Sequence, residues 1–225
     1  MEVSLEMGPA NTVAKLDFQP GDVWTTEAGA MIAMSSGLEL ETTTHKKGSG
    51  GILKAMKRML AGESFFMNHY TASSAATLWL APAMPGDISA HQLNGDSIIV
   101  QSGSFLACDS QVNLDMGWQG FKTMFSGESL FWLNISGSGL VLLSSFGCIY
   151  PVDVDGSYVV DTSHIVAFEE TLDFRISKAG SSWFHSFLGG EGLVCAFEGT
   201  GRVWCQSHSL KSFGSALRPL LKPKK

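Results

Sequence analysis

Long apolar runs are missing from this chain of 225 residues. No stretch approaches the roughly 18 to 20 apolar residues that a membrane-spanning helix needs, so the sequence predicts no such helix. The first six residues are acidic and lack both the basic start of a secretory signal and the arginines of a transit peptide. We therefore expect a cytoplasmic protein.

Cysteine is scarce and is never spaced as a metal site requires. Structural zinc sites typically contain Cys-x-x-Cys pairs, and the four cysteines form none. No two histidines have the helical spacing of a zinc pair. Cys195 and Cys205 flank residues 198–201 and would face each other if these residues were a hairpin turn. In a reducing compartment we expect both to be thiols.

Nucleotide-binding and catalytic patterns are also absent. Gly48, Gly50 and Gly51 lack the strand-to-helix setting and the lysine of a phosphate loop. Residues 161–164, Asp-Thr-Ser-His, have the residue types of a hydrolase triad. We expect them on one strand, where adjacent side chains point to opposite faces and cannot form the hydrogen-bonded chain of a triad. The sequence thus predicts no enzyme, no catalytic residue, no metal and no cofactor.

Charge is sparse, at 16% of residues, and the net charge is −6. The basic residues gather in two segments, the first with Lys46, Lys47, Lys54, Lys57 and Arg58 and the second with Lys211, Arg218, Lys222, Lys224 and Lys225. The rest of the chain is strongly acidic, which argues against nucleic acid as a partner. The two basic segments can still attract anions locally.

The residues that are abundant favour β-structure. Glycine occupies 25 positions, and Val, Ile, Phe and Trp are frequent. This composition is typical of many short strands joined by tight turns. We predict an all-β fold.

A first sequence box occurs three times. Its copies are Pro20-Gly21-Asp22 followed by residues 27–33, Asn94-Gly95-Asp96 followed by residues 101–107, and Asp155-Gly156-Ser157 followed by residues 161–167. Each copy predicts a turn, a strand, a small-residue kink and an apolar strand that ends at Ala, because Asn-Gly and Asp-Gly tolerate positive φ. Within the kinks we expect Gly29 and Gly103 at a bulge or a close backbone approach.

A second box recurs about every 64 residues, a spacing typical of small β-units. Its copies are residues 62–66, 127–131 and 190–194. After each copy opens a strand, we expect a turn at small residues and a returning strand, which together make a β-hairpin; the turns are residues 73–75, 137–139 and 199–201. Between the boxes, apolar residues with helical spacing predict short helices at residues 52–60, 118–125 and 183–188.

The boxes divide the chain into three β-units and a basic C-terminal tail. The units are residues 1–85, 86–149 and 150–211, and the tail is residues 212–225. Prolines near residue 85 interrupt strand pairing at the first boundary. No long polar linker separates the units, so we expect one cooperative body in a pseudo-threefold arrangement.

Five segments resemble the altered-inheritance-of-mitochondria protein family and its uncharacterised bacterial relatives. They are residues 27–31, 80–86, 101–107, 127–131 and 190–194, and the resemblance runs from about residue 8 to residue 208. It implies a double-stranded β-helix-like fold, grouped with the tryptophan RNA-binding attenuation protein, and a trimeric assembly. Fungal members are mitochondrial and affect inner-membrane organisation. The family brings no established catalytic residues.

Glu63, Glu128 and Glu191 occupy the same place in the three copies of the second box. Around a pseudo-threefold axis their carboxylates would form a ring able to bind a cation. The alternative, which we favour, is that each Glu enters a strand from a turn and is solvated or bonds local backbone N–H groups. Unpaired carboxylates repel one another, which opposes a ring without a cation.

Lys54, Lys57 and Arg58 make residues 52–60 a basic amphipathic segment. We favour a short helix that docks on its own sheet with its charges in water. The alternative is contact with an anionic surface, either lipid headgroups or nucleic-acid phosphate.

The repeats, the missing catalytic constellation and the resemblance favour a non-enzymatic scaffold or binding protein that works as a homotrimer. A link with membrane organisation, through weak contact with anionic lipid, follows from the resemblance and the basic segment. Matching aromatic residues in the second and third units, at residues 118–125 and 183–187, are typical of interface cores. Two alternatives stay open: an RNA-binding protein, by analogy of fold alone, and a small-molecule-binding β-barrel.

Overall fold

Antiparallel strands make up most of the structure, a computed structural model that describes residues 1–44, 66–115, 132–178 and 193–221. The first part of the chain, residues 1–85, contains β1 (Glu2–Glu6), β2 (Val13–Phe18), β3 (Val23–Glu27), β4 (Met31–Met34), β5 (Leu38–Thr44), β6 (Phe66–Ala72) and β7 (Ala76–Leu80). The middle part, residues 86–148, contains β8 (Ile88–Gln101), the 3-10 helix η1 (Ser102–Ser104), β9 (Phe105–Asp109), β10 (Val112–Asp115) and β11 (Trp132–Ser144). The last part contains β12 (Ile149–Asp161), η2 (Thr162–His164), β13 (Ile165–Glu169), β14 (Asp173–Lys178), β15 (Leu193–Gln206), α3 (Leu210–Leu217) and η3 (Arg218–Leu220).

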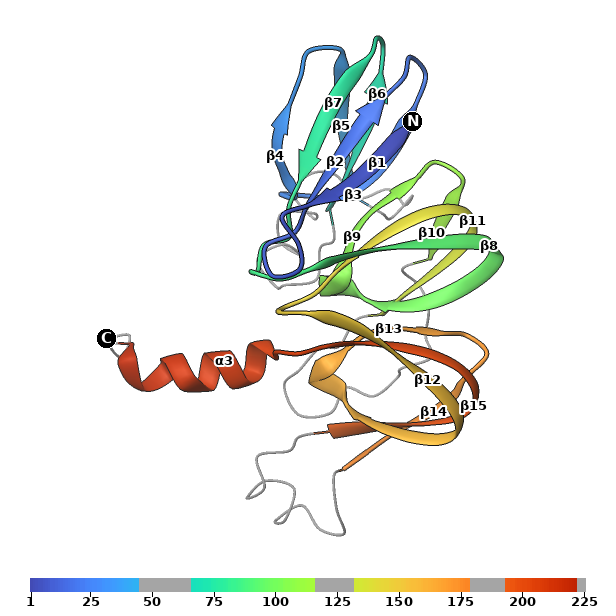
Figure 1. Ribbon diagram of the computed structural model, residues 1–225, viewed down its shortest axis with the longest axis vertical. Helices are drawn as coiled ribbons and strands as arrows, with labels where there is room; N and C mark the ends of the chain where they lie inside the picture. The colour runs from blue at the N-terminus through green and yellow to red at the C-terminus, as the bar shows by residue number, and fades with distance from the viewer. Residues whose placement is uncertain (45–65, 116–131, 179–192, 222–225) are drawn as a thin grey trace.

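The strands form two sheets, which confirms the expected all-β fold. One sheet has the order β1-β2-β7-β4, and the larger has the order β12-β15-β13-β8-β11-β9-β3-β6-β5, with β10 on β11 and β14 on β15. The three parts of the chain follow one another along the longest axis of the molecule, with the last part at the opposite end from the N-terminus (Figure 1). Within the described ranges, no helix combines the length and apolar character that crossing a membrane would need.

The middle and last parts carry the same elements in the same order. A long strand pairs along its length with a second long strand, β8 with β11 and β12 with β15. After the 3-10 helix, β9 pairs with the end of β11, and β13 likewise pairs with the end of β15. The next short strands, β10 and β14, pair with the beginnings of β11 and β15. In the first part each long strand is replaced by two shorter ones, so that β2 and β4 pair with β7, while β3 and β5 pair with β6.

The small-residue segments at 137–139 and 199–201 do not reverse the chain, so the predicted hairpins were wrong. β11 and β15 continue through them, and β8 and β12 likewise continue through the Asn-Gly and Asp-Gly sequences expected as turns. Residues 73–75 do separate two strands, but β6 and β7 pair with other strands and belong to different sheets. The turn at residues 20–22 is confirmed, with the Asp22 amide donating to the Gln19 oxygen at 3.0 Å.

Positive-φ glycines explain why these strands bend without ending. Gly95 has φ +92°, and the register between β8 and β11 shifts beside it, which is a β-bulge. Gly156 has φ +98° and lies opposite Gly199 in the β12–β15 pair. A positive-φ glycine therefore changes the direction of a strand, while hydrogen-bonded pairing with the neighbouring strand continues on both sides of it.

Cys195 and Cys205 lie on opposite halves of one strand, β15. They cannot face each other, because the hairpin on which that expectation depended is absent. Both thiols are free and buried. Burial raises the pKa of Cys195 to about 12 and that of Cys205 to about 11, so neither is an activated nucleophile.

Gly29 and Gly103 lie at neither the expected bulge nor a close backbone approach: Gly29 is in the turn between β3 and β4, and Gly103 is in η1. A Cβ built on either glycine meets nothing within 4 Å. A Cβ on Gly86 would instead overlap the backbone carbonyl of Ser145, because Gly86 and Gly147 form a parallel bridge between the two connecting segments. This contact ties the link after the first part to the link after the middle part.

The hydrophobic core crosses the boundaries between the three parts. One buried cluster joins Trp24 and Tyr70 of the first part to Leu106 of the middle part. Another joins Ile99 of the middle part to Phe168 of the last part. The parts therefore share their cores.

Candidate ligand pocket

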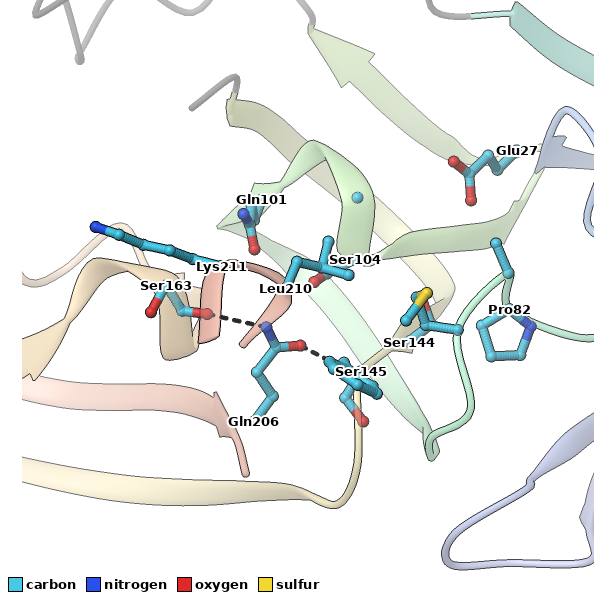
Figure 2. Close-up of a pocket in the computed structure, with 14 residues that line it drawn as sticks. Glu27, Pro82, Gln101, Ser104, Ser144, Ser145, Ser163, Gln206, Leu210 and Lys211 are labelled. Atoms are coloured by element: carbon cyan, nitrogen blue, oxygen red, sulfur yellow. Dashed lines mark hydrogen bonds between the residues drawn. The ribbon is translucent and has the colours of Figure 1, made fainter. Parts of the chain in front are cut away.

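A pocket of about 590 Å³ opens where strand ends from all three parts of the chain meet. Glu27 comes from the end of β3, Gln101 from the end of β8 and Gln206 from the end of β15 (Figure 2). The rest of the lining comes from η1, η2, the segment after β7, the end of β11 with the segment that follows it, and the first turn of α3. These elements place side chains from distant parts of the sequence around one space.

Gln206 holds one wall of the pocket together. Its buried side-chain amide donates to the Ser163 carbonyl at 3.0 Å, and its side-chain oxygen accepts from the Phe146 amide at 2.9 Å (Figure 2). The side chain thereby connects η2, the segment after β11 and the end of β15. Buried hydrogen bonds of this kind fix a surface, because leaving either partner unsatisfied is costly.

The segment after β11 is held from its other side as well. The Ser145 amide donates to the Asp87 carbonyl at 3.0 Å, and the Asp87 amide donates to the Gly147 carbonyl at 3.0 Å. Ser145 Oγ donates to the Gly147 carbonyl at 2.7 Å. The backbone that lines the pocket is thus fixed without a ligand.

Glu27 lines the pocket with a carboxyl group whose pKa is shifted by burial. Its side chain is half-buried, and burial raises its pKa to about 7. Figure 2 shows its carboxyl group across the pocket from Gln206 and Lys211. Near neutral pH this carboxyl group can therefore donate a hydrogen bond or carry a negative charge.

The remaining lining is mixed. Pro82, Met84, Phe146 and Leu210 supply apolar surface, while Gln101 and serine residues supply hydrogen-bonding groups. Pockets for small molecules usually combine a mainly apolar lining with a few placed polar groups, and their volumes range from about 300 to 1,000 Å³. Both the size and the lining of this pocket suit a small ligand with an apolar body.

The triad-like residues 161–164 do not have the geometry of a nucleophile and its base. The expected strand is wrong, because residues 162–164 form η2. The Ser163 and His164 side chains are instead kept apart by bonding to different partners. Ser163 Oγ donates to Asp161 Oδ1 at 2.6 Å, and His164 Nδ1 lies 2.8 Å from the Gln206 carbonyl. No hydrogen bond between Ser163 and His164 is found among the described residues, whereas nucleophilic catalysis requires that pair.

The other sequence-predicted site residues lie outside the described residues. These are Glu63, Glu128 and Glu191 of the proposed carboxylate ring, and Lys54, Lys57 and Arg58 of the proposed anionic contact. The helices expected at residues 52–60, 118–125 and 183–188 fall there too. These expectations stay predictions.

Sequence reasoning missed the pocket. The first box did place Glu27 and Gln101 at the same position of two copies, which is the signal that could have brought them together. Gln206 carries no comparable signal, because its role depends on bonds to Phe146 and Ser163.

Fold and pocket define an all-β protein of antiparallel sheets with a half-polar pocket at its strand ends. Residues 4–208 match the family described as Mitochondrial biogenesis AIM24, and the chain belongs to that family. This confirms the resemblance seen in the sequence.

Two relatives from Streptococcus pyogenes support the assignment. An uncharacterised protein of serotype M6 is 30% identical over 227 residues, covering 98% of this chain and 91% of that protein. The X-ray crystal structure of another S. pyogenes protein has a TM-score of 0.81 and 28% identity, covering 98% of this chain and 99% of that chain.

Proposed function

We propose that this protein is a non-enzymatic, oligomeric binding protein whose pocket holds a small molecule. The observation that carries the proposal is the pocket itself, in which Glu27 has a raised pKa opposite a wall fixed by Gln206. The ligand has an apolar body, which packs against Met84, Phe146 and Leu210. It also has an amine or hydroxyl group, which bonds to Glu27.

Binding fits this site better than catalysis. The Ser163 hydroxyl is bonded to Asp161, and the pKa values of Cys195 and Cys205 are raised by burial, which disfavours the reactive thiolate. A single carboxyl group is enough to bind and orient a ligand. A shifted pKa alone does not make that group a catalyst, because acid–base catalysis also needs a reacting proton within its reach. The proposal therefore assigns Glu27 to recognition.

A screen for ligand-induced stabilisation tests the proposal. The full chain is melted with primary amines, alcohols and, as a comparison, carboxylates of similar size. A ligand at 100 times its Kd adds about 2.7 kcal/mol to the free energy of unfolding. We expect amines or alcohols to raise the Tm of the wild type, and Glu27→Gln to reduce that shift.

Glu39→Gln, on β5 and exposed, is the matched control and is expected to keep the full shift. If no compound raises Tm, or if the shift in Glu27→Gln equals that of the wild type, the pocket is not the binding site proposed.

We further propose that the three parts of the chain are three copies of one β-unit. The supporting observation is a shared irregularity in strand pairing. Ala33, Ala107 and Ala167, the last residues of the three first boxes, pair with Trp79, Leu142 and Trp204 directly beside a register shift in each case. Chance does not readily place one irregularity at one box position three times. The double-stranded β-helix type and the pseudo-threefold arrangement stay predictions.

The proposed oligomer is a homotrimer, as the family resemblance implies, and the proposed location is the cytoplasm. All four cysteines are free, and three of them are buried, as is usual for proteins of reducing compartments. Membrane contact through Lys54, Lys57 and Arg58 is part of the same proposal. It is tested by sedimentation with anionic and neutral vesicles at low salt, where equal binding to both would contradict it.

A further inference from the structure

Strand β4 exposes apolar side chains that its counterparts bury. Ile32 is 56% exposed and Met34 is 45% exposed. Yet β4, β9 and β13 begin at the same position of the three copies of the first box. The corresponding residues of those strands, Leu106 and Cys108 in β9 and Val166 and Phe168 in β13, are buried. An exposed apolar strand at a sheet edge is a site where another strand can pair.

The reason for this difference is a missing neighbour. β9 pairs with β11 on one side and with β3 of the preceding part on the other. β13 pairs in the same way with β15 and with β8 of the preceding part. β4 pairs with β7, and among the described strands it has no partner on its other side and ends its sheet.

The complementary edge lies at the opposite end of the molecule. β3 and β8 are covered by β9 and β13 of the following part, but no described strand covers the second half of β12, which ends the larger sheet. Tyr158 and Val159 there are 45% and 57% exposed, whereas Ile98 and Ile99, their counterparts in β8, are buried.

The two internal junctions share one antiparallel register. At the first junction, Thr25 lies opposite Cys108 and Thr26 opposite Ala107. At the second, Ile99 lies opposite Phe168 and Val100 opposite Ala167. Counted from the boxes, these are the same positions. The same register applied to the free edges places Val159 opposite Met34 and Val160 opposite Ala33.

We infer that the second half of β12 in one copy pairs with β4 of a second copy, by the same junction that joins adjacent parts within the chain. This inference rests on the proposed self-association and names its surfaces. The partner is a second copy of this chain, because the two edges are complementary and each occurs once among the described strands. Strand addition at an edge supplies main-chain hydrogen bonds, and the alternating side chains supply the specificity.

Such an interface joins two different surfaces, head to tail. Head-to-tail contacts close into a ring if the rotation per copy allows it and otherwise grow into a filament. In the proposed trimer, three of these junctions close a ring and leave no β4 and no second half of β12 unpaired. A dimer with a single junction would still expose one β4 and one β12.

Two variants that each block one edge test the inference. Ile32→Glu places a charge on β4, and Val159→Glu places one on β12, at side chains that are already exposed in the single chain. Each variant alone is expected to be a monomer of 24.1 kDa by light scattering. Mixed in equal amounts, they are expected to form a dimer of about twice that mass, because the intact β4 of one variant meets the intact β12 of the other.

Leu5→Glu is the matched control. Leu5 is exposed on β1, the other edge of the sheet that contains β4, and this variant is expected to assemble as the wild type does. Circular dichroism of each variant checks that the strands still form.

Cross-linking tests the register independently of the charged variants. With Cys148, the exposed cysteine, replaced by Ser, the pair Met34→Cys and Val159→Cys is expected to form disulfides between copies on mild oxidation. Cysteines directly opposite each other on paired strands have a suitable Cα separation. Met34→Cys with Tyr150→Cys, on the other half of β12 and also exposed, is expected to cross-link at least tenfold less.

The outcomes separate this inference from the proposed self-association. Charged variants that assemble like the wild type, or cross-linking no greater for Val159→Cys than for Tyr150→Cys, would overturn the pairing of β4 with β12 while the oligomer stands. A wild-type chain that remains a monomer at every concentration would overturn both. If the charged variants fail to fold, the cross-linking comparison decides.

Discussion

At the residue scale, contact with backbone decides which glycines can be replaced. Gly86 faces the Ser145 carbonyl, whereas Gly103 faces open space. We expect Gly86→Ala to lower the free energy of unfolding by about 1 to 3 kcal/mol, because the backbone must shift to accept the methyl group. Gly103→Ala is the control and should change it by less than about 0.5 kcal/mol. Urea denaturation of both variants measures this, and equal effects would contradict the close approach at Gly86.

Glu27 makes stability depend on pH. Its pKa is about 7 in the folded protein against an ordinary value of 4.5. Between these values the folded state binds more protons than the unfolded state, so stability falls as pH rises from about 4.5 to 7. Glu27→Gln removes this penalty and should stabilise the protein by about 1 to 3 kcal/mol at pH 8, but not at pH 4.

Urea denaturation of wild type and Glu27→Gln at both pH values checks the sign. A difference between the two proteins that is the same at pH 4 and pH 8 would mean that burial does not perturb the Glu27 carboxyl group.

At the scale of elements, positive φ rather than crowding makes glycine necessary at one position of β12. Gly156 has φ +98°, and a Cβ there meets nothing within 4 Å. We expect Gly156→Val to cost about 1 to 2 kcal/mol from backbone strain alone. Ser157→Val, at the next and also exposed position of β12, should cost nothing measurable. Thermal melts of the two variants compare them, and equal Tm values would show that β12 does not need the bend.

Sequence reasoning predicted a chain rich in strands but misjudged the chain direction at the small-residue segments. Gly137 and Gly199 were interpreted as hairpin turns, yet they lie inside β11 and β15. Glycine allows positive φ in a turn and in a bulge alike, so the local sequence does not distinguish a reversal from a bend. The choice depends on whether partner strands lie alongside both halves, which is a long-range property.

At the scale of the whole molecule, shared cores make the three parts depend on one another. Leu106 of the middle part packs in the cluster that contains Trp24 and Tyr70, and Ile99 packs in the cluster that contains Phe168. We therefore expect residues 86–149 expressed alone to be much less stable than the full chain, because these two clusters would lose most of their members. A third cluster, which includes Leu93, Phe105 and Ile135, lies mostly within the fragment and would remain. Circular dichroism and thermal melts of the fragment and of the full chain compare the two, and equal Tm values would show an independent domain.

The sequence alone was sufficient for the family and the all-β class, because composition and local pattern carry these properties. Only the tertiary structure decided the course of the strands through their glycines and the gathering of Glu27, Gln101 and Gln206 around one pocket. The tertiary structure alone also showed that β4 is exposed where β9 and β13 are buried, although all three strands begin at the same position of the first box. Burial of an apolar strand depends on the strand beside it, and the described strands provide β4 with a neighbour on one side only.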